Sequence, residues 1–226
     1  MSKKIFLTIV INYFPFVFLC TFISLFFTIE MSLTNVWIFI AYLYLLPPFL
    51  FRFLSLFYKK NKMHFTDDDS YYYFWWFGVQ LQVIYLRFPF LEELIKMVPT
   101  LYSRWLRLWG GKIGRNIYWS ANVKILDRAY LNLGDGIVFG YGASLSSHYI
   151  INQNKRANLY LSEIIIGDYA MVGGVSMMGA GSRLGAGDLL PARKTLLPFQ
   201  EIIKGRKTMR SDIDIPSLKE QEKEDS

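Results

Sequence analysis

The chain has 226 residues, of which 53% are hydrophobic and 18% aromatic, and its formal net charge is +7. A mean hydropathy of +0.24 is too high for an ordinary soluble domain, and the basic surplus flanks apolar segments, which favours membrane lipid over nucleic acid as the partner. The single cysteine, Cys20, excludes an internal disulfide and a metal cluster of several cysteines.

The N-terminal part predicts two membrane-spanning helices. The first apolar run extends from Ile5 to Ile29; as a helix of about 25 residues it would measure about 37 Å, enough to cross a bilayer. The second run, Val36 to Tyr58, contains Pro47-Pro48 and Arg52, so we expect a kink or an early exit from the hydrocarbon. A cleaved signal peptide is the alternative for the first run, but that run is too long and lacks a small-residue cleavage site.

The charges at the ends of these runs predict their orientation. Lysines precede the first run and follow the second, whereas the short connection between them contains Glu30 and no Lys or Arg. The positive-inside rule therefore predicts a transmembrane helical hairpin over residues 1–65 with both ends in the cytoplasm. We expect the protein in the cytoplasmic (inner) membrane, with both termini and the soluble domain on the cytoplasmic side.

Residues 66–109 predict shorter, aromatic-rich helices. The sequence from Thr66 to Asp69 predicts the start of a helix, because its acidic residues would lie near the positive end of the helix dipole. Pro89 and Pro99 divide the segment, and its charged and amide side chains make a third membrane crossing improbable. We expect helices that lie in the membrane interface; the alternative is that they are buried against the following domain.

A repeat of six residues dominates residues 110–200. It is clearest where an aliphatic or Met residue precedes glycine, at Ile166-Gly167, Val172-Gly173, Met178-Gly179 and Leu184-Gly185. A period of six fits neither an amphipathic helix nor an alternating strand, but it fits a chain that turns a corner every six residues around a narrow apolar prism. Upstream, the frame shifts by two residues at Asn132 and is interrupted from Ser146 to about Glu163, so about four coils are expected.

Residues 201–226 follow the last hexad. They are mostly polar, and they end in the charged sequence SLKEQEKEDS. We expect a largely disordered tail.

The repeat resembles that of the hexapeptide-repeat acyltransferases, which are built on a left-handed parallel β-helix. The segments LNLGDGIVFGYGASLSSH and EIIIGDYAMVGGVSMMGAG are similar to β-helix acetyltransferases of polysaccharide assembly and to a membrane-attached β-helix module found at the end of some peptide synthetases. The resemblance implies a mainly β fold, in which a short left-handed parallel β-helix follows the transmembrane hairpin and the interfacial helices. It also implies a homotrimer.

Of the two histidines, His148 is the candidate for catalysis. It lies where the hexad frame breaks, and in the resembled acyltransferases a histidine at such a junction is the general base. An imidazole with a pKa of about 6.5 can take a proton from an acceptor and return it to a leaving thiolate. Glu163 or Asp168 is a candidate to orient its ring. The alternative is a polar loop histidine bonded to a backbone carbonyl, and we interpret His64 as a solvated residue at the membrane edge.

The resemblance also implies where the substrates bind. The co-substrate would be acetyl-CoA or an acyl carrier protein thioester, with no permanently bound cofactor and no metal. The expected donor-binding residues are Gly173, Gly174, Gly179, Ala180, Arg183, Arg193 and Lys194, although the turns need their glycines whether or not anything binds. The expected acceptor-binding residues are Asn152, Asn154, Lys155 and Arg156; for the last two, the alternatives are a donor phosphate or the solvated lipid surface.

The predicted function is a membrane-bound acyltransferase, most simply an O-acetyltransferase. It would move an acyl group from a coenzyme A or carrier thioester to a lipid-linked or otherwise apolar acceptor at the cytoplasmic face. The alternative is a catalytically silent trimeric scaffold of a membrane biosynthetic complex. His148 discriminates between the two, because a scaffold has no need of a general base.

Overall fold

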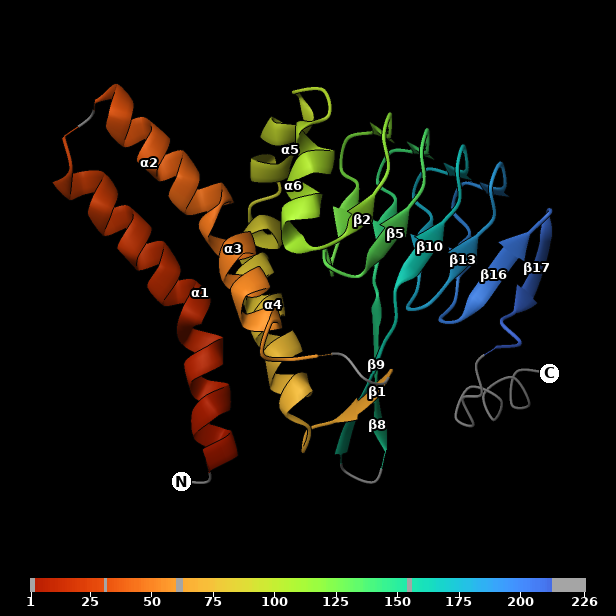
Figure 1. Cartoon of the computed structure of the whole chain (residues 1–226), viewed down its shortest axis with the longest axis horizontal. Coiled ribbons are helices and arrows are strands. Elements are labelled where there is room, and N and C mark those ends of the chain that lie inside the picture. Colours follow the sequence, from red (N-terminus) through yellow and green to blue (C-terminus); the bar gives the residue numbers. More distant parts are fainter. Residues whose placement is uncertain (1–2, 31, 60–62, 154–155, 213–226) are drawn as a thin grey trace.

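The computed structural model describes residues 3–30, 32–59, 63–153 and 156–212 (Figure 1). A group of N-terminal helices lies at one end of the molecule, and a parallel β-helix extends away from it. A long antiparallel hairpin leaves the β-helix from one corner. The candidate site lies where these three parts meet.

The first three helices only partly match the predicted transmembrane hairpin. They are α1 (Lys3–Thr28), α2 (Leu33–Tyr44) and α3 (Leu46–Ser55). Within the described residues, α1 is the one helix that is long and apolar enough by itself to cross a membrane; α2 and α3 pass the same test only as a pair bent by 43°. The predicted kink near Pro47-Pro48 is confirmed. A second span stays a prediction, because α2 alone measures about 18 Å and Pro47, Pro48 and Phe51 of α3 are buried in the protein.

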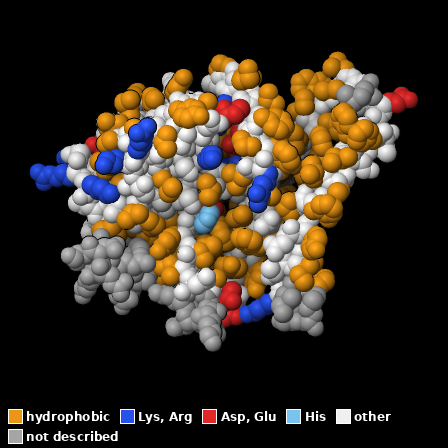
Figure 2. All heavy atoms as spheres, turned by 180° about the vertical axis from the view of Figure 1, so that it is seen from behind, with side chains coloured by type: hydrophobic (Ala, Val, Ile, Leu, Met, Phe, Trp, Pro, Cys, Tyr) orange, Lys and Arg blue, Asp and Glu red, His pale blue; other side chains and the backbone are white. Residues whose placement is uncertain are grey.

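Helix α1 is attached to the body of the protein through its first half. Lys4 forms an ion pair with Asp68, and Trp76 Nε1 donates a 2.7 Å hydrogen bond to Asn12 Oδ1. Most of its other side chains are apolar and exposed, as Figure 2 shows for the helical end of the molecule. Soluble proteins seldom expose so large an apolar surface, so this helix favours contact with lipid.

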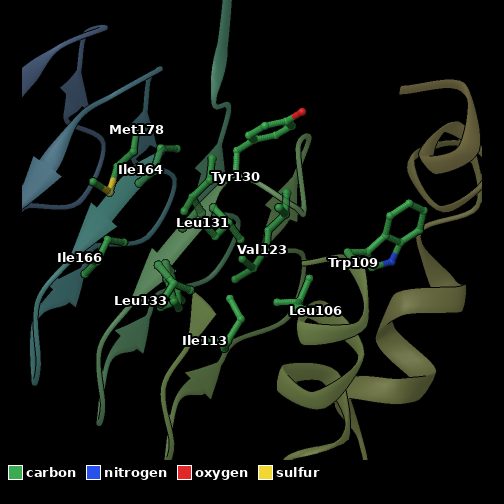
Figure 3. Packing of buried hydrophobic residues seen from close by; sticks show 14 of the residues in the cluster. Leu106, Trp109, Ile113, Val123, Tyr130, Leu131, Leu133, Ile164, Ile166 and Met178 are labelled. Atoms are coloured by element: carbon green, nitrogen blue, oxygen red, sulfur yellow. The ribbon is translucent and has the colours of Figure 1, made fainter. Parts of the chain in front are cut away.

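Three further helices follow, divided at Pro89 and Pro99 as predicted. They are α4 (Ser70–Arg87), α5 (Phe90–Lys96) and α6 (Leu101–Trp109). Contrary to the expectation of an interfacial position, many of their aromatic rings pack inside the protein: Tyr71, Trp75, Tyr85, Tyr102, Trp105 and Trp109 are buried. Figure 3 shows Leu106 and Trp109 at the end of the β-helix, near Ile113 of the first coil. The exposed side chains of Phe88, Phe90 and Met97 leave contact with a lipid surface as a prediction for α5 and its flanks.

The predicted β-helix is confirmed as three parallel sheets that form the sides of a prism. The first sheet contains β2 (Lys112–Ile113), β5 (Leu131–Leu133), β10 (Ile164–Ile166), β13 (Arg183–Leu184) and β16 (Gln200–Ile203). The second sheet contains β3 (Tyr118–Trp119), β6 (Val138–Phe139), β11 (Met171–Val172) and β14 (Leu189–Leu190). The third sheet contains β4 (Lys124–Ile125), β7 (Ser144–Leu145), β12 (Met177–Met178) and β15 (Thr195–Leu196).

The six-residue repeat determines which side chains enter the prism. Ile166 pairs in register with Leu184, Val172 with Leu190, and Met178 with Leu196. All six are buried, and Figure 3 shows Ile113, Leu133 and Ile166 on successive coils with their side chains in the common core. The apolar position of each hexad therefore forms the core of the prism.

The two-residue shift of the frame lies at a different place from that expected. The sequence predicts the shift at Asn132, but Leu131 and Leu133 both point inward from β5, with Asn132 between them. Ile125 and Leu133 are eight positions apart instead of six. The two extra residues belong to the corner between β4 and β5, and this corner contains Asp127 and Arg128.

The β-helix continues beyond residue 200, so the prediction of a tail from 201 is wrong for the first part of that segment. β16 adds to the first sheet, and β17 (Arg206–Met209) pairs with it in antiparallel fashion. Arg210 closes this end: its guanidinium donates a 2.7 Å hydrogen bond to Gly181 O. Residues 213–226 lie outside the described residues.

The interruption between Ser146 and Glu163 is a β-hairpin, not an irregular loop. β8 (His148–Gln153) pairs antiparallel with β9 (Arg156–Leu161), and β1 (His64–Thr66) adds a third strand to β9. The β-branched and aromatic residues on both sides of a polar centre are typical of a hairpin, and this signal was present in the sequence. The hairpin ties the chain after the N-terminal helices to the corner that contains His148.

Candidate active site

Two irregular corners of successive coils bring Asp127 and His148 together. β4 and β7 are neighbours in the third sheet, with Ile125 opposite Leu145. The chain leaves the six-residue frame after each of these strands, first with the two extra residues and then with the hairpin. Stacking of the coils therefore places Asp127 directly beside the start of β8.

The carboxylate of Asp127 receives three hydrogen bonds. Its Oδ2 lies 2.7 Å from His148 Nδ1 and accepts from Ser147 N at 3.0 Å, and its Oδ1 accepts from Trp75 Nε1 at 3.1 Å. The side chain of Asp127 is 1% exposed, whereas that of His148 is 22% exposed. A buried carboxylate with this many donors is firmly held, and it holds the imidazole in turn.

This arrangement determines which ring nitrogen of His148 is available for chemistry. The indole and the backbone amide can only donate, so Asp127 acts as the acceptor and Nδ1 of His148 carries the proton. Nε2 is then the basic nitrogen, and it has no hydrogen-bond partner among the described residues. The pair is an Asp–His dyad poised for proton transfer at Nε2.

Two opposing effects set the pKa of His148. Burial lowers it, while the hydrogen bond and the negative charge of Asp127 raise it by more, so that the pKa lies above its ordinary value of 6.5. A raised pKa makes the imidazole a stronger base, and it also stabilises the imidazolium that forms when the proton is taken.

Helix α4 forms one wall of the dyad. The Trp75 ring lies 5.1 Å from the His148 ring, centroid to centroid, at an interplanar angle of 61°. Ser147, the residue before His148, is also held in place, because its Oγ donates to Tyr130 O at 2.8 Å. The hydroxyl of Tyr130 lies 3.0 Å from that of Tyr71 in α4. Aromatic rings, chiefly from α4, thus shield one side of the dyad.

Neither of the two residues expected to orient the His148 ring contacts it. Glu163 lies 3.6 Å from Lys112 in an ion pair, and Asp168 Oδ1 accepts from the backbone N–H of Asp135 at 2.8 Å. Asp127 takes this role instead. The eight-residue step between Ile125 and Leu133 was the sequence signal that marked its corner as unusual.

Arg128, the neighbour of Asp127, fastens the helices to the same corner. Its side chain is fully buried, Nε donates to Glu92 Oε1 at 2.9 Å, and Nη1 donates to Gln82 Oε1 at 3.0 Å. Its guanidinium also lies 5.2 Å from the ring centroid of Tyr85. A buried, fully paired arginine between α4, α5 and the corner holds the dyad and its helical wall in a constant relative position.

A cavity of about 660 Å³ lies between the helices and the β-helix. Its walls include Tyr85, Leu86 and Pro89 from the helices and Lys124, Leu126 and Tyr141 from the β-helix. Neither Asp127 nor His148 lines it; Leu126, the residue before Asp127, is the lining residue nearest to them in the chain. Its volume falls within the range of about 300–1,000 Å³ that is usual for small-molecule sites.

Most of the predicted donor-binding residues flank the third sheet. Gly173, Gly174, Arg193 and Lys194 lie at the corner before it, and Gly179 and Ala180 lie at the corner after it, on the same edge as His148. The glycines are required by the stacking of the coils: a Cβ on Gly179 would lie 2.8 Å from Pro198 N, and one on Gly173 would collide with Ala192. Ala180 is buried, and its carbonyl accepts from Phe199 N at 2.8 Å.

Arg183 does not lie with the other predicted donor-binding residues. It lies in β13 of the first sheet, where Nη2 donates to Asp212 at 3.1 Å. Lys207 does lie with them: its Nζ donates to Thr195 O of β15 at 3.1 Å, which places a third cation near Arg193 and Lys194 at the last coil. Lys207 was missed because it lies in the segment expected to be disordered.

The predicted acceptor-binding residues lie toward the far end of the hairpin. Asn152 pairs with Ala157, and a strand of four residues from His148 spans about 13 Å. Asn152 is therefore not beside the imidazole. Asn154 and Lys155 lie outside the described residues, and Arg156 is placed only by its backbone, opposite Gln153.

His64, expected to be a solvated residue, pairs with β9. Its side chain is exposed, its Nε2 lies 3.0 Å from Asn158 Oδ1, and its ring stacks on Tyr160 at 4.7 Å. These contacts leave His148 as the candidate base.

Comparison with known proteins gives no family and only distant structural similarity. No family model and no curated protein matches the sequence. Similar solved structures include a hexapeptide-repeat acetyltransferase from Vibrio cholerae, at 14% identity and a TM-score of 0.38, over 59% of this chain and 93% of that one. Another is a maltose O-acetyltransferase from Clostridium difficile, at 14% identity and a TM-score of 0.29, over 67% and 93%. Because these values are low, the geometry of this chain alone supports the function given below.

Proposed function

We propose that the protein is an acyltransferase in which His148 is the general base and Asp127 orients it. The observation that carries this proposal is the dyad: a partly exposed imidazole whose Nδ1 is 2.7 Å from a buried carboxylate. Such a pair suits proton transfer at Nε2. The three cations near the last coil and the cavity beside the first coils suggest separate places for two substrates.

The reaction follows from this arrangement. An acceptor hydroxyl or amine donates its hydrogen bond to Nε2 and loses its proton there as its oxygen or nitrogen attacks the carbonyl carbon of an acyl thioester. The tetrahedral intermediate then collapses with cleavage of the C–S bond. The proton on Nε2 passes to the thiolate, so that the free thiol and the acylated acceptor leave and the neutral dyad is restored.

The two substrates would bind toward opposite ends of the β-helix, the donor at the last coil and the acceptor near the first coils. Arg193, Lys194 and Lys207, near the last coil, would bind the phosphates of coenzyme A or of a carrier-bound pantetheine arm. The cavity beside Leu86 and Leu126 would hold the acceptor. Since Leu86 and Pro89 lie next to the exposed Phe88 and Phe90, an apolar or lipid-linked acceptor fits this side best.

The membrane part would bring the enzyme and such an acceptor to one surface. The Lys4–Asp68 ion pair places the start of α1 beside the soluble domain, which supports a cytoplasmic N-terminus under the positive-inside rule. We propose a cytoplasmic-membrane protein with both termini in the cytoplasm. In a Cys20→Ser background, cysteines at Ser2 and Ser226 should react with an impermeant maleimide only after permeabilisation, and labelling of intact cells would contradict this topology.

A homotrimer is part of the proposal. The outer face of the second sheet exposes apolar side chains, with Tyr118 at 64%, Met171 at 49% and Leu189 at 52%. Neighbouring copies would cover this face and complete the donor groove. Mass measurement of the protein in nanodiscs should give three copies, and an active monomer would contradict the assembly.

The experiment that tests the function uses radiolabelled acetyl-CoA and membranes that contain the full-length protein. We expect label in a lipid-extractable product that is absent from membranes without the protein. Acetylated acyl carrier protein, supplied instead, identifies the donor. The alternative, a silent scaffold, would give no label from either thioester and no binding of coenzyme A by calorimetry.

A further inference from the structure

An apolar groove lies between α2, α5 and α6, away from the residues of the dyad. Its volume is about 640 Å³, and its walls include Trp37 and Ile40 of α2, Leu45 directly after α2, and Leu94 of α5. The polar groups of the surrounding aromatic residues are satisfied elsewhere: Trp105 Nε1 donates to Tyr44 O at 2.8 Å, and Tyr44 OH donates to Leu91 O at 2.9 Å. The groove is therefore suited to a hydrocarbon chain.

One charged side chain lines this groove, and it also lines a second cavity. Arg104 borders an adjoining pocket of about 250 Å³ together with Arg107 and Arg115, and no acidic residue lines that pocket. Arg107 is held by hydrogen bonds to Ile113 O at 2.8 Å and to Gly114 O at 2.7 Å. Arg104 and Arg115 have no ion-pair partner within the described part of the chain. The three guanidinium groups together attract an anion.

The groove opens onto an apolar surface. Trp37 is 63% exposed and Leu45 39%, and next to α5 Met97 is 79% and Val98 51% exposed. These residues belong to the helical end of the protein, with α1 and α2 (Figure 1). An apolar surface next to three arginines matches a lipid molecule, whose acyl chains are apolar and whose headgroup lies at the bilayer surface.

We propose that the groove and the arginine pocket together bind one anionic phospholipid. An acyl chain would lie between α2, α5 and α6, and the phosphate would contact Arg104 and the neighbouring arginines. A zwitterionic lipid brings a phosphate as well, but it also brings a cation that three arginines repel; a net negative headgroup therefore fits better. The site is distinct from the acyl-transfer site, and it would seat the β-helix on the anionic leaflet.

The test is native mass spectrometry of the full-length protein in detergent, with dioleoyl phosphatidylglycerol and dioleoyl phosphatidylcholine as the probes. The wild type should retain the anionic lipid in preference. Arg104→Gln should weaken phosphatidylglycerol binding about fivefold, the value expected for one cation near an anionic lipid. Arg87→Gln, which removes an exposed charge that lines neither cavity, is the matched control and should bind as the wild type does.

A second pair of variants tests the groove itself. Ala41→Phe adds bulk inside the groove and should reduce retention of both lipids, whereas Ile38→Phe places the same aromatic side chain outside it and should change nothing. Equal retention of the two lipids by the wild type would overturn the proposal. So would equal losses in Arg104→Gln and Arg87→Gln, or competition by soluble glycerol phosphate, which would indicate a site for the free anion instead of a lipid.

Discussion

Trp75 of α4 donates a 3.1 Å hydrogen bond to Asp127, the residue that orients His148, and the two lie 52 positions apart in the chain. The next residue, Trp76, donates to Asn12 of α1. Adjacent tryptophans on one helix thus connect the dyad of the β-helix and the apolar N-terminal helix to the same rigid element. The position of α1 and the geometry of the dyad are therefore connected through α4.

The first prediction concerns this bond. Trp75→Phe keeps the aromatic wall but removes the donor to Asp127. Since a hydrogen bond to a charged group is worth about 1.5–3 kcal/mol, kcat should fall roughly tenfold or more, while KM for the donor stays unchanged. Trp76→Phe, which loses its bond to Asn12 instead, is the control and should keep its rate within about twofold; equal losses would mean that the effect is one of folding.

The second prediction concerns His148 itself. His148→Ala should lower kcat by roughly 10²- to 10⁴-fold, which is the usual worth of a positioned acid–base group. Binding of coenzyme A, measured by calorimetry, should survive because Arg193, Lys194 and Lys207 are untouched. His64→Ala is the internal control and should stay within a few-fold of the wild-type rate. Full activity in His148→Ala would remove the basis of the enzyme proposal.

The third prediction is a pH dependence. In the wild type, burial lowers the His148 pKa but Asp127 raises it by more, so the rate should fall as the pH falls through a pKa above 6.5. In Asp127→Asn only burial remains, so the acid limb of the kcat/KM profile should move to lower pH. The rate at its plateau should also drop by roughly 10²- to 10⁴-fold, because the required tautomer is no longer favoured. An unmoved acid limb would show that another group titrates.

The raised pKa of His148 also makes the stability of the fold depend on pH. Because the folded-state pKa of His148 is raised, its pairing with Asp127 stabilises the fold fully below the unfolded value of about 6.5, and this stabilisation is lost as the pH rises through the folded value. The difference in unfolding free energy between the wild type and Asp127→Asn should therefore be larger at pH 5 than at pH 9. Guanidinium chloride titrations in detergent at about these two pH values measure it.

The fourth prediction concerns the buried Arg128–Glu92 pair. Arg128→Met leaves Glu92 buried without its cation, which should cost about 3–5 kcal/mol of unfolding free energy. Adding Glu92→Gln, which removes the orphaned charge and can still accept from Tyr102, should recover much of this loss. Tryptophan fluorescence during unfolding in detergent reports both. A double variant no more stable than Arg128→Met would show that the pair itself is not the source of the stability.

The sequence was sufficient for features set by local periodicity. The hexad positions of Ile166, Val172, Met178 and Leu184 predicted a parallel β-helix, because a six-residue period allows few other ways to bury one side chain per repeat. Pro89 and Pro99 predicted the breaks between α4, α5 and α6, because proline lacks a backbone N–H and disfavours the helical conformation of the residue before it. The frame break identified His148 as the residue that departs from this regularity.

The tertiary structure alone decided which residues complete the site. Asp127 and His148 meet because one coil stacks on the next, and Trp75 reaches them because Arg128 fastens α4 to the same corner; none of these contacts has a period that a local pattern reveals. The aromatic helices were expected in the membrane interface, and composition cannot distinguish a ring that faces lipid from one that faces protein. Burial depends on what the rest of the chain places beside a residue, and here the open end of the prism made Trp105 and Trp109 part of the core.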